Sequence, residues 1–235
     1  MYFMKHIFYH GTSSLFLRSI HKYGLGGINP NKEWKLLELL VYLYEISESR
    51  LQGNKEYAKI RDSTKAMAFQ EQLSVEKGIY EGTHNFNHKN IYLSYGEIRA
   101  VVYAVNNEYG SEILTRIITL YRLLKKARVG IDIPMRLDSI GIERIEKQHF
   151  FPLLIGIDNI DSSSLLTEYG ESADKYFSII SELRNTLDYY SFWEKMQRYN
   201  FQSLSPISVS KLTFYKVLYT GYIGSSNFTW DTVKL

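Results

Sequence analysis

The sequence predicts an α+β domain with a mostly strand-based core and helices inserted between the strands. Strand-like segments gather near the two ends of the chain and around residues 91 and 150, and the segments between them have helical periodicity. Strands and helices do not alternate, as a parallel α/β sheet would require. With 235 residues, the chain has room for one large domain with a helical insert. We therefore expect a single domain over residues 1–235.

Composition narrows the class of protein. Hydrophobic residues make up 45% of the chain and charged residues 23%, which is typical of a folded protein and not of a disordered one. No apolar run reaches the roughly 18–20 residues that a membrane span needs, and we find no signal-peptide pattern. The absence of cysteine excludes thiolate nucleophiles and Cys-ligated zinc. We expect a cytoplasmic protein with no membrane partner.

The first segment predicts a strand, a tight turn and a helix. Residues 5–9 (KHIFY) are aromatic and β-prone. Thr12, Ser13 and Ser14 are candidate N-caps for the helix, and Gly24 is a natural stop after it. The leucines and other apolar residues of the segment between these signals fit one buried helix face.

The next segment predicts a helical lobe. Residues 33–50 place apolar side chains on one stripe of a helix, and residues 54–77 continue the helical pattern with more polar side chains. The stripe comprises Leu36, Leu37, Leu40, Leu43 and Tyr44. Residues 78–89 are rich in glycine and asparagine, which predicts a loop. We therefore expect a helical insertion over residues 27–89.

Beyond this lobe, short strands are separated by helices. The expected elements are a strand at 90–94, helices at 96–105 and 111–126, a buried strand at 150–157, helices at 172–183 and 187–199, and strands at 201–204 and 212–219.

Two short patterns point to a binding site. His10 and Gly11 stand where the first strand gives way to the first helix, so an imidazole lies beside a backbone that a ligand can approach closely. Tyr92 ends a strand and Tyr103 lies on the next helix, with ten residues between them. Two such rings can converge on a slot for a flat, cationic ring. In a chain with 20 tyrosines, core packing is the alternative for this pair.

Together these segments resemble the diphtheria-toxin and PARP-like class of ADP-ribosyltransferases. That class has a His-Gly element after the first strand, two tyrosines separated by ten residues, and an acidic residue on a late strand. The resemblance rests on residues 9–25 (YHGTSSLFLRSIHKYGL) and 90–104 (NIYLSYGEIRAVVYA), which look like the corresponding motifs of bacterial members. It implies a split, mostly antiparallel sheet that cradles a nucleotide.

The resemblance also implies the ligand contacts. NAD⁺ would be the substrate, and no metal would be needed. His10 would hydrogen-bond the adenosine ribose, the Gly11 backbone would hold the nicotinamide carboxamide, and Tyr92 and Tyr103 would sandwich the nicotinamide ring. Secondary polar contacts would come from Thr12 and Ser94.

The late acidic residue is where the sequence departs from the family. The matching segment, residues 200–212 (NFQSLSPISVSKL), has Gln202 at that point. An amide can bind a ribose hydroxyl but stabilises an oxocarbenium-like transition state less than a carboxylate does. Three interpretations stay open: transfer to a strong nucleophile, binding of NAD⁺ or ADP-ribose without turnover, or an acid elsewhere in the chain, at Glu168, Glu171, Glu182 or Glu194.

The resulting expectation is a toxin-like mono-ADP-ribosyltransferase that cleaves NAD⁺ and passes ADP-ribose to a macromolecule, either protein or nucleic acid. A toxin-like member would also have an antitoxin or other inhibitor protein as a partner. The alternative is a catalytically degenerate module that binds NAD⁺, ADP-ribose or a partner protein. An RNA 2′-phosphotransferase on the same fold would need pocket arginines that the sequence does not place.

Other charged or histidine-rich patterns have simpler explanations. His84 and His88 have zinc-like spacing but fall in the expected loop. The Asp158–Asp161 segment lacks the glycine and closing glutamate of a calcium loop, so a capping turn is the better interpretation. The basic residues at 125–128 fit a helix end that complements the helix dipole.

Overall fold

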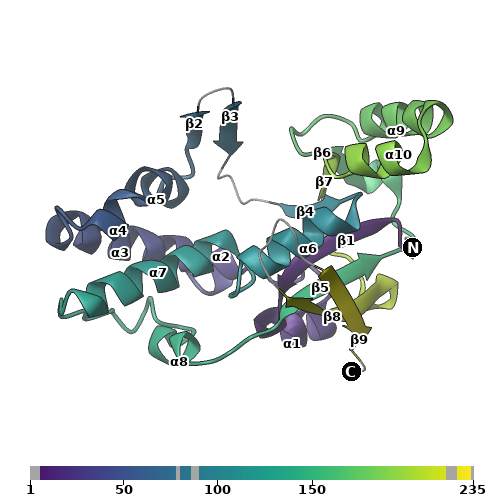
Figure 1. Cartoon of the computed structure of the whole chain (residues 1–235). Coiled ribbons are helices and arrows are strands. Elements are labelled where there is room, and N and C mark those ends of the chain that lie inside the picture. The colour runs from purple at the N-terminus through teal and green to yellow at the C-terminus, as the bar shows by residue number, and fades with distance from the viewer. Residues whose placement is uncertain (1–5, 78–79, 86–89, 221–226, 234–235) are drawn as a thin grey trace. The chain divides into compact units, whose positions relative to one another are not determined.

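The protein is α+β, as the sequence predicts. The computed structural model describes residues 6–77, 80–85, 90–220 and 227–233. It divides into two compact units (Figure 1). The first, which we call the sheet unit, comprises residues 1–28, 90–111 and 150–235, and the second, the helical unit, comprises residues 29–89 and 112–149.

The sheet unit is built on a seven-stranded sheet in which every neighbouring pair is antiparallel. Its order in space is β6 (Leu165–Thr167), β7 (Asn200–Ser203), β4 (Ile91–Ser94), β1 (Phe8–Ser13), β5 (Pro152–Ile157), β8 (Leu212–Thr220) and β9 (Asn227–Thr232). The sequence predicts five of these strands. It misses β6, which has only three residues, and β9.

Four α-helices belong to this unit: α1 (Leu17–Tyr23), α6 (Glu97–Asn106), α9 (Asp174–Thr186) and α10 (Tyr189–Met196). Of the candidate caps after β1, Ser13 is the one used, because its hydroxyl accepts a hydrogen bond from the Leu15 N–H at 3.3 Å. α1 stops at Gly24, whose φ of +81° is a conformation that favours glycine.

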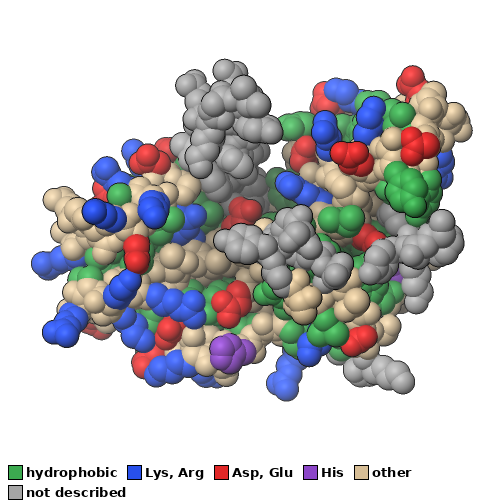
Figure 2. Space-filling view, in the orientation of Figure 1, with side chains coloured by type: hydrophobic (Ala, Val, Ile, Leu, Met, Phe, Trp, Pro, Cys, Tyr) green, Lys and Arg blue, Asp and Glu red, His purple; other side chains and the backbone are tan. Residues whose placement is uncertain are grey.

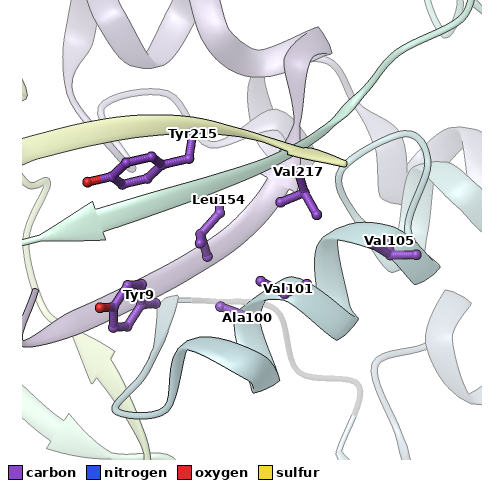
Figure 3. Close-up of a cluster of buried hydrophobic side chains, with 7 residues drawn as sticks. All are labelled: Tyr9, Ala100, Val101, Val105, Leu154, Tyr215 and Val217. Carbon is purple, nitrogen blue, oxygen red and sulfur yellow. The ribbon is translucent and has the colours of Figure 1, made fainter. Parts of the chain in front are cut away.

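One face of the sheet packs against α6 through a close backbone contact. A Cβ on Gly11 would lie 1.9 Å from the carbonyl oxygen of Ala100, so only glycine allows β1 and α6 to approach this closely. Around this point, strand residues meet the helix in one apolar cluster (Figure 3). Its members are Tyr9, Leu154, Tyr215 and Val217 from the strands and Ala100, Val101 and Val105 from α6.

The opposite face of β1, β4 and β7 is aromatic. Phe8 and Phe201 meet edge to face with ring centroids 5.2 Å apart, and Phe177 of α9 stacks on Phe201 at 5.1 Å. Because strand side chains alternate between faces, burying these phenylalanines under α9 turns their sequence neighbours toward the other face. Tyr92, Ser94, Asn200 and Gln202 therefore lie on the α6 side of the sheet, whereas His10, two residues after Phe8, lies on the same side of β1 as Phe8.

The helical unit contains α2 (Pro30–Glu33), α3 (Leu36–Arg50), α4 (Lys55–Ala58), α5 (Arg61–Ala68), α7 (Glu112–Lys126), α8 (Ile142–Glu146) and a hairpin of β2 (Gln72–Lys77) and β3 (Tyr80–Asn85). Its core is formed where α3 packs against α7. Of the stripe predicted for α3, Leu36, Leu40, Leu43 and Tyr44 are buried and Leu37 is only partly buried. Leu39, which is not part of the predicted stripe, is also fully inaccessible to solvent.

Two expectations for this unit are wrong. The helix expected to continue to residue 77 ends instead at Ala68, the last residue of α5. Gln70 then has a left-handed φ of +55°, and residues 72–77 form the strand β2. Its partner β3 lies within the expected loop. The alternation of polar and apolar residues in QLSVEK is strand periodicity, which the helical interpretation overlooked. The unit is also not confined to residues 27–89, because residues 112–149 complete it.

The basic residues near the end of α7 are paired with acidic ones. Figure 2 shows basic and acidic side chains mixed over the surface of the helical unit. Lys125 and Arg122 both contact Glu146, at 3.2 and 3.3 Å, and Lys126 contacts Glu56 at 2.9 Å. In the part of the chain that the structure describes, no helix is both long and apolar enough to cross a membrane.

The contact at Gly11 makes a testable prediction about stability. Gly11→Ala would drive a methyl group into the Ala100 carbonyl, and neither backbone can yield without distorting β1 or α6. We expect a loss of about 1–3 kcal/mol or more in the free energy of unfolding, measured by urea denaturation. Gly130→Ala is the control, because a Cβ there meets nothing within 4 Å. Equal stability of the two variants would contradict the packing argument.

Candidate functional site

The three strands that carry the sequence motifs lie side by side. β1 carries His10, β4 carries Tyr92 and β7 carries Gln202, and β4 is the middle strand of the three. Tyr92 stands directly opposite Gln202 in the β4–β7 pairing. Tyr92 and Gln202, which are 82 and 192 positions further along the chain than His10, are thus brought to neighbouring strands.

The sheet opens between β1 and β4. β1 pairs with β5 along all six of its residues but with β4 at one position, Tyr9 opposite Ser94. Further along, the His10 side chain reaches the carbonyl oxygen of Tyr92, with Nδ1 at 2.8 Å. The imidazole therefore binds a strand carbonyl that a continued ladder would satisfy from the backbone.

The hydrogen bond sets the protonation of His10. A carbonyl oxygen only accepts, so Nδ1 carries the hydrogen and donates it. Burial lowers the pKa of His10 below its ordinary value of 6.5, and the hydrogen bond to Tyr92 opposes this only in part. The imidazole is therefore neutral at pH 7, and its Nε2 holds a lone pair that can accept a hydrogen bond from a ligand hydroxyl.

The face opposite the phenylalanines is polar across β4 and β7. Tyr92 pairs with Gln202 and Ser94 pairs with Asn200, and directly opposed residues share a face. The Ser94 hydroxyl donates to Oδ1 of Asn200 at 3.1 Å. Asn200 is absent from the sequence-based site, although its position two residues before Gln202 places it on the same side of a strand.

Gln202 is held at both ends of its amide. Its Oε1 accepts a hydrogen bond from Nδ2 of Asn90 at 2.6 Å, and its Nε2 donates to the backbone carbonyl of Glu168 at 2.7 Å. Only 8% of the residue is exposed. Gln202 therefore lies directly opposite Tyr92 in the sheet, but its polar atoms bind other parts of the protein.

Of the four alternative acids, Glu168 is the one at this site. It follows β6, its N–H donates to the Asn200 carbonyl at 3.0 Å, and its Oε2 accepts from Nδ2 of Asn200 at 3.0 Å. The pKa of Tyr92 is raised, first by burial and second by the negative charge of Glu168. The other three are exposed: Glu171 pairs with Lys175, and Glu182 and Glu194 lie on α9 and α10.

The remaining predicted contacts have the following places. Tyr103 is half-buried on α6, which contacts both β1 and β4. Gly11 faces the α6 backbone, which by itself accounts for a glycine there. Thr12 is buried, and its hydroxyl donates to the carbonyl of Gly110 at 3.0 Å. The Ser94 hydroxyl binds Asn200. In this structure both hydroxyls thus have partners within the protein.

The histidine and aspartate patterns that suggest a metal in the sequence have the following outcomes. Among the residues that the structure describes, no three His, Asp or Glu side chains are grouped closely enough to hold a metal ion. His88 and the side chain of His84 lie outside the described residues. Asp161 accepts a hydrogen bond from the Ser163 N–H at 3.0 Å, which confirms the expected capping turn. Asp158 accepts from the ring of His6 at 2.7 Å.

Comparisons with protein-family models, with curated proteins and with solved structures give no match for this chain.

The state of His10 makes a prediction about pH. Because its pKa in the folded protein lies below the unfolded value, the unfolded chain binds the proton first as the pH falls below 6.5. His10 thus contributes to a loss of stability that begins near pH 6.5 and continues down to its folded pKa. We expect His10→Asn to lose less melting temperature than the wild type between about pH 7.5 and about pH 5.5.

The matched control is His21→Asn, since His21 is exposed on α1. Nitrogen NMR of the imidazole gives a direct check, with His10 expected to be neutral and protonated on Nδ1 at pH 6.5. A His10 pKa above 6.5, or the same acid sensitivity in His10→Asn and the wild type, would contradict this interpretation.

Proposed function

We propose that the protein is an NAD⁺-dependent mono-ADP-ribosyltransferase of toxin-like character, with the fold of that superfamily in its sheet unit. The observation that carries the proposal is the adjacency of three strands, in which β4 with Tyr92 lies between β1 with His10 and β7 with Gln202. The motifs that suggest NAD⁺ in the sequence are thus neighbours in space and not scattered over the fold. The acceptor is a macromolecule, either protein or nucleic acid.

In this proposal each group has a defined task. The neutral Nε2 of His10 accepts a hydrogen bond from a ribose hydroxyl of the adenosine half. Tyr92 and Tyr103 stack on the nicotinamide ring, whose cationic form is attracted to aromatic faces. The half-buried ring of Tyr92 and its raised pKa keep the phenol neutral at pH 7, so its hydroxyl is able to donate to the ligand.

The chemistry is cleavage of the bond between C1 of the nicotinamide ribose and the ring nitrogen. The transition state is oxocarbenium-like, so the site must hold the ribose, exclude stray water and stabilise positive charge. Binding the adenosine half away from the reacting bond supplies the energy that orients the reacting half. The acceptor then attacks C1 in place of water.

A second function is favoured by one observation, the engagement of both ends of the Gln202 amide. If no other group supplies negative charge to the ribose, the site binds NAD⁺ or ADP-ribose without turnover and acts as a sensor or partner-binding module. NAD⁺ would then raise the melting temperature with no release of nicotinamide.

The test is release of nicotinamide from NAD⁺ by the purified protein, with and without cell lysate as a source of acceptor. We expect His10→Ala and Tyr92→Ala each to lower kcat/KM about 100-fold or more, because misplacing the substrate by about 1 Å has an effect of this size. Label in the adenine half should move to lysate material. Digestion of the product with nuclease or protease then identifies the acceptor class.

Two exposed residues of the same types serve as controls. His21→Ala on α1 and Tyr190→Ala on α10, whose tyrosine is 77% exposed, should behave as the wild type. Wild-type turnover in folded His10→Ala and Tyr92→Ala would reject the transferase. No release together with no effect of NAD⁺ on the melting temperature would reject the sensor as well.

A further inference from the structure

We propose that Glu168, held beside β7 by Asn200, supplies the negative charge of the nucleotide site, and that Gln202 is a positioning residue that holds Glu168 there. This inference rests on the proposed function for its chemistry, but its geometry belongs to the sheet unit alone. It moves the charge of the site from the late strand β7 to the turn that follows β6.

Two hydrogen bonds orient the side-chain amide of Gln202. Oε1 accepts from Asn90 on one side, and Nε2 donates to the Glu168 carbonyl on the other. A carboxylate at position 202 has no hydrogen to donate, so it would place a negative oxygen against that carbonyl oxygen. A residue that both accepts and donates is therefore required here, which gives a physical reason for glutamine in this position.

Asn200 holds the Glu168 carboxylate in place. Asn200 contacts this residue twice: its backbone carbonyl accepts from the Glu168 N–H, and its Nδ2 donates to Oε2, both at 3.0 Å. The Oδ1 of the same asparagine accepts from the Ser94 hydroxyl at 3.1 Å. Ser94 and Asn200 thus form a relay from β4 to Glu168 on the polar face of the sheet, which is the face of Tyr92.

The negative charge of Glu168 acts on the site around Tyr92. Glu168 is half-buried, so water screens its charge less than that of a fully exposed group. Its negative charge acts on the hydroxyl of Tyr92 and contributes to the raised pKa of that tyrosine. A group that destabilises negative charge on Tyr92 stabilises positive charge in the same place. That is where the nicotinamide and the reacting ribose would lie.

The reaction then balances as follows. The bond from ribose C1 to nicotinamide nitrogen breaks, and its electron pair stays on the nitrogen, which leaves as neutral nicotinamide. Positive charge develops at C1 and is stabilised by the Glu168 carboxylate. A lone pair of the acceptor forms the new bond to C1, and the proton that the acceptor loses passes to the carboxylate.

The experiment compares Glu168→Gln, Gln202→Glu and the double variant with both changes. We expect Glu168→Gln to lower kcat for nicotinamide release about 100-fold, with a much smaller change in KM, because the charge acts on the transition state. Gln202→Glu should also lose activity, and the double variant should not recover it. The control is Glu171→Gln, which removes an exposed carboxylate three residues away and should retain wild-type activity.

Two readouts do not depend on turnover. Carbon NMR of labelled tyrosine, assigned with Tyr92→Phe, should show a lower Tyr92 pKa in Glu168→Gln and no change in Glu171→Gln. Binding should change selectively: Glu168→Gln should weaken NAD⁺, which carries the cationic ring, about tenfold and leave ADP-ribose, which lacks it, unchanged.

These readouts separate the two proposals. If the wild type releases no nicotinamide, the transferase fails, and the Tyr92 titration and the NAD⁺ selectivity still decide whether Glu168 charges the site. Wild-type kcat in Glu168→Gln, an unchanged Tyr92 pKa, or equal loss of NAD⁺ and ADP-ribose binding would each overturn the inference. A gain of activity in Gln202→Glu would also overturn it, since the charge would then be needed on β7.

Discussion

The contact between Gly11 and the Ala100 carbonyl is the constraint on which the sheet unit depends. A helix normally packs on a sheet through side chains, at a distance that those side chains determine. Here α6 lies against β1 with backbone touching backbone, because position 11 has no Cβ to intervene. The position of Tyr103 relative to β1 follows from this approach, and so does the path of β4, which leads directly into α6. Glycine is thus required at position 11 for packing, before any contact with a ligand is considered.

The opening between β1 and β4 is the second organising feature. A ladder bond there would satisfy the Tyr92 carbonyl but leave no room for a ligand group between the strands. The His10 imidazole satisfies the same carbonyl and keeps its other nitrogen available as an acceptor. The loss of strand pairing on this side is offset on the other, where β1 pairs with β5 along its whole length. The single hydrogen bond from Nδ1 of His10 thus satisfies the Tyr92 carbonyl and fixes the tautomer of the imidazole.

How much of this is predictable depends on how local the signal is. The strands that carry His10, Tyr92 and Gln202 are marked by short β-prone segments, whereas the prediction that these residues share a site comes from the resemblance to a known family. The α3 stripe indicates a buried face but not its partner, α7, so the helical unit is only half predicted. β2 and β3 are not predicted, because the short segment of alternating polar and apolar residues in β2 follows a helix almost directly. The sequence does not single out Glu168 among the four candidate acids, because it follows a three-residue strand and contacts Gln202 across 34 positions of sequence.

The two proposed functions, transferase and NAD⁺ sensor, differ in the role that they give to the side-chain amide of Gln202. Considered alone, Gln202 suggests a site that has lost its acid. With its partners included, the amide bridges Asn90 and the backbone of Glu168, and the carboxylate that follows is held by Asn200 on the face of Tyr92. A glutamate at position 202 could not donate to the Glu168 carbonyl. The uncharged residue at position 202 and the carboxylate at position 168 therefore belong to one hydrogen-bonded arrangement. If the proposed role of Glu168 holds, an uncharged glutamine on β7 is compatible with catalysis, because its amide binds the backbone of Glu168.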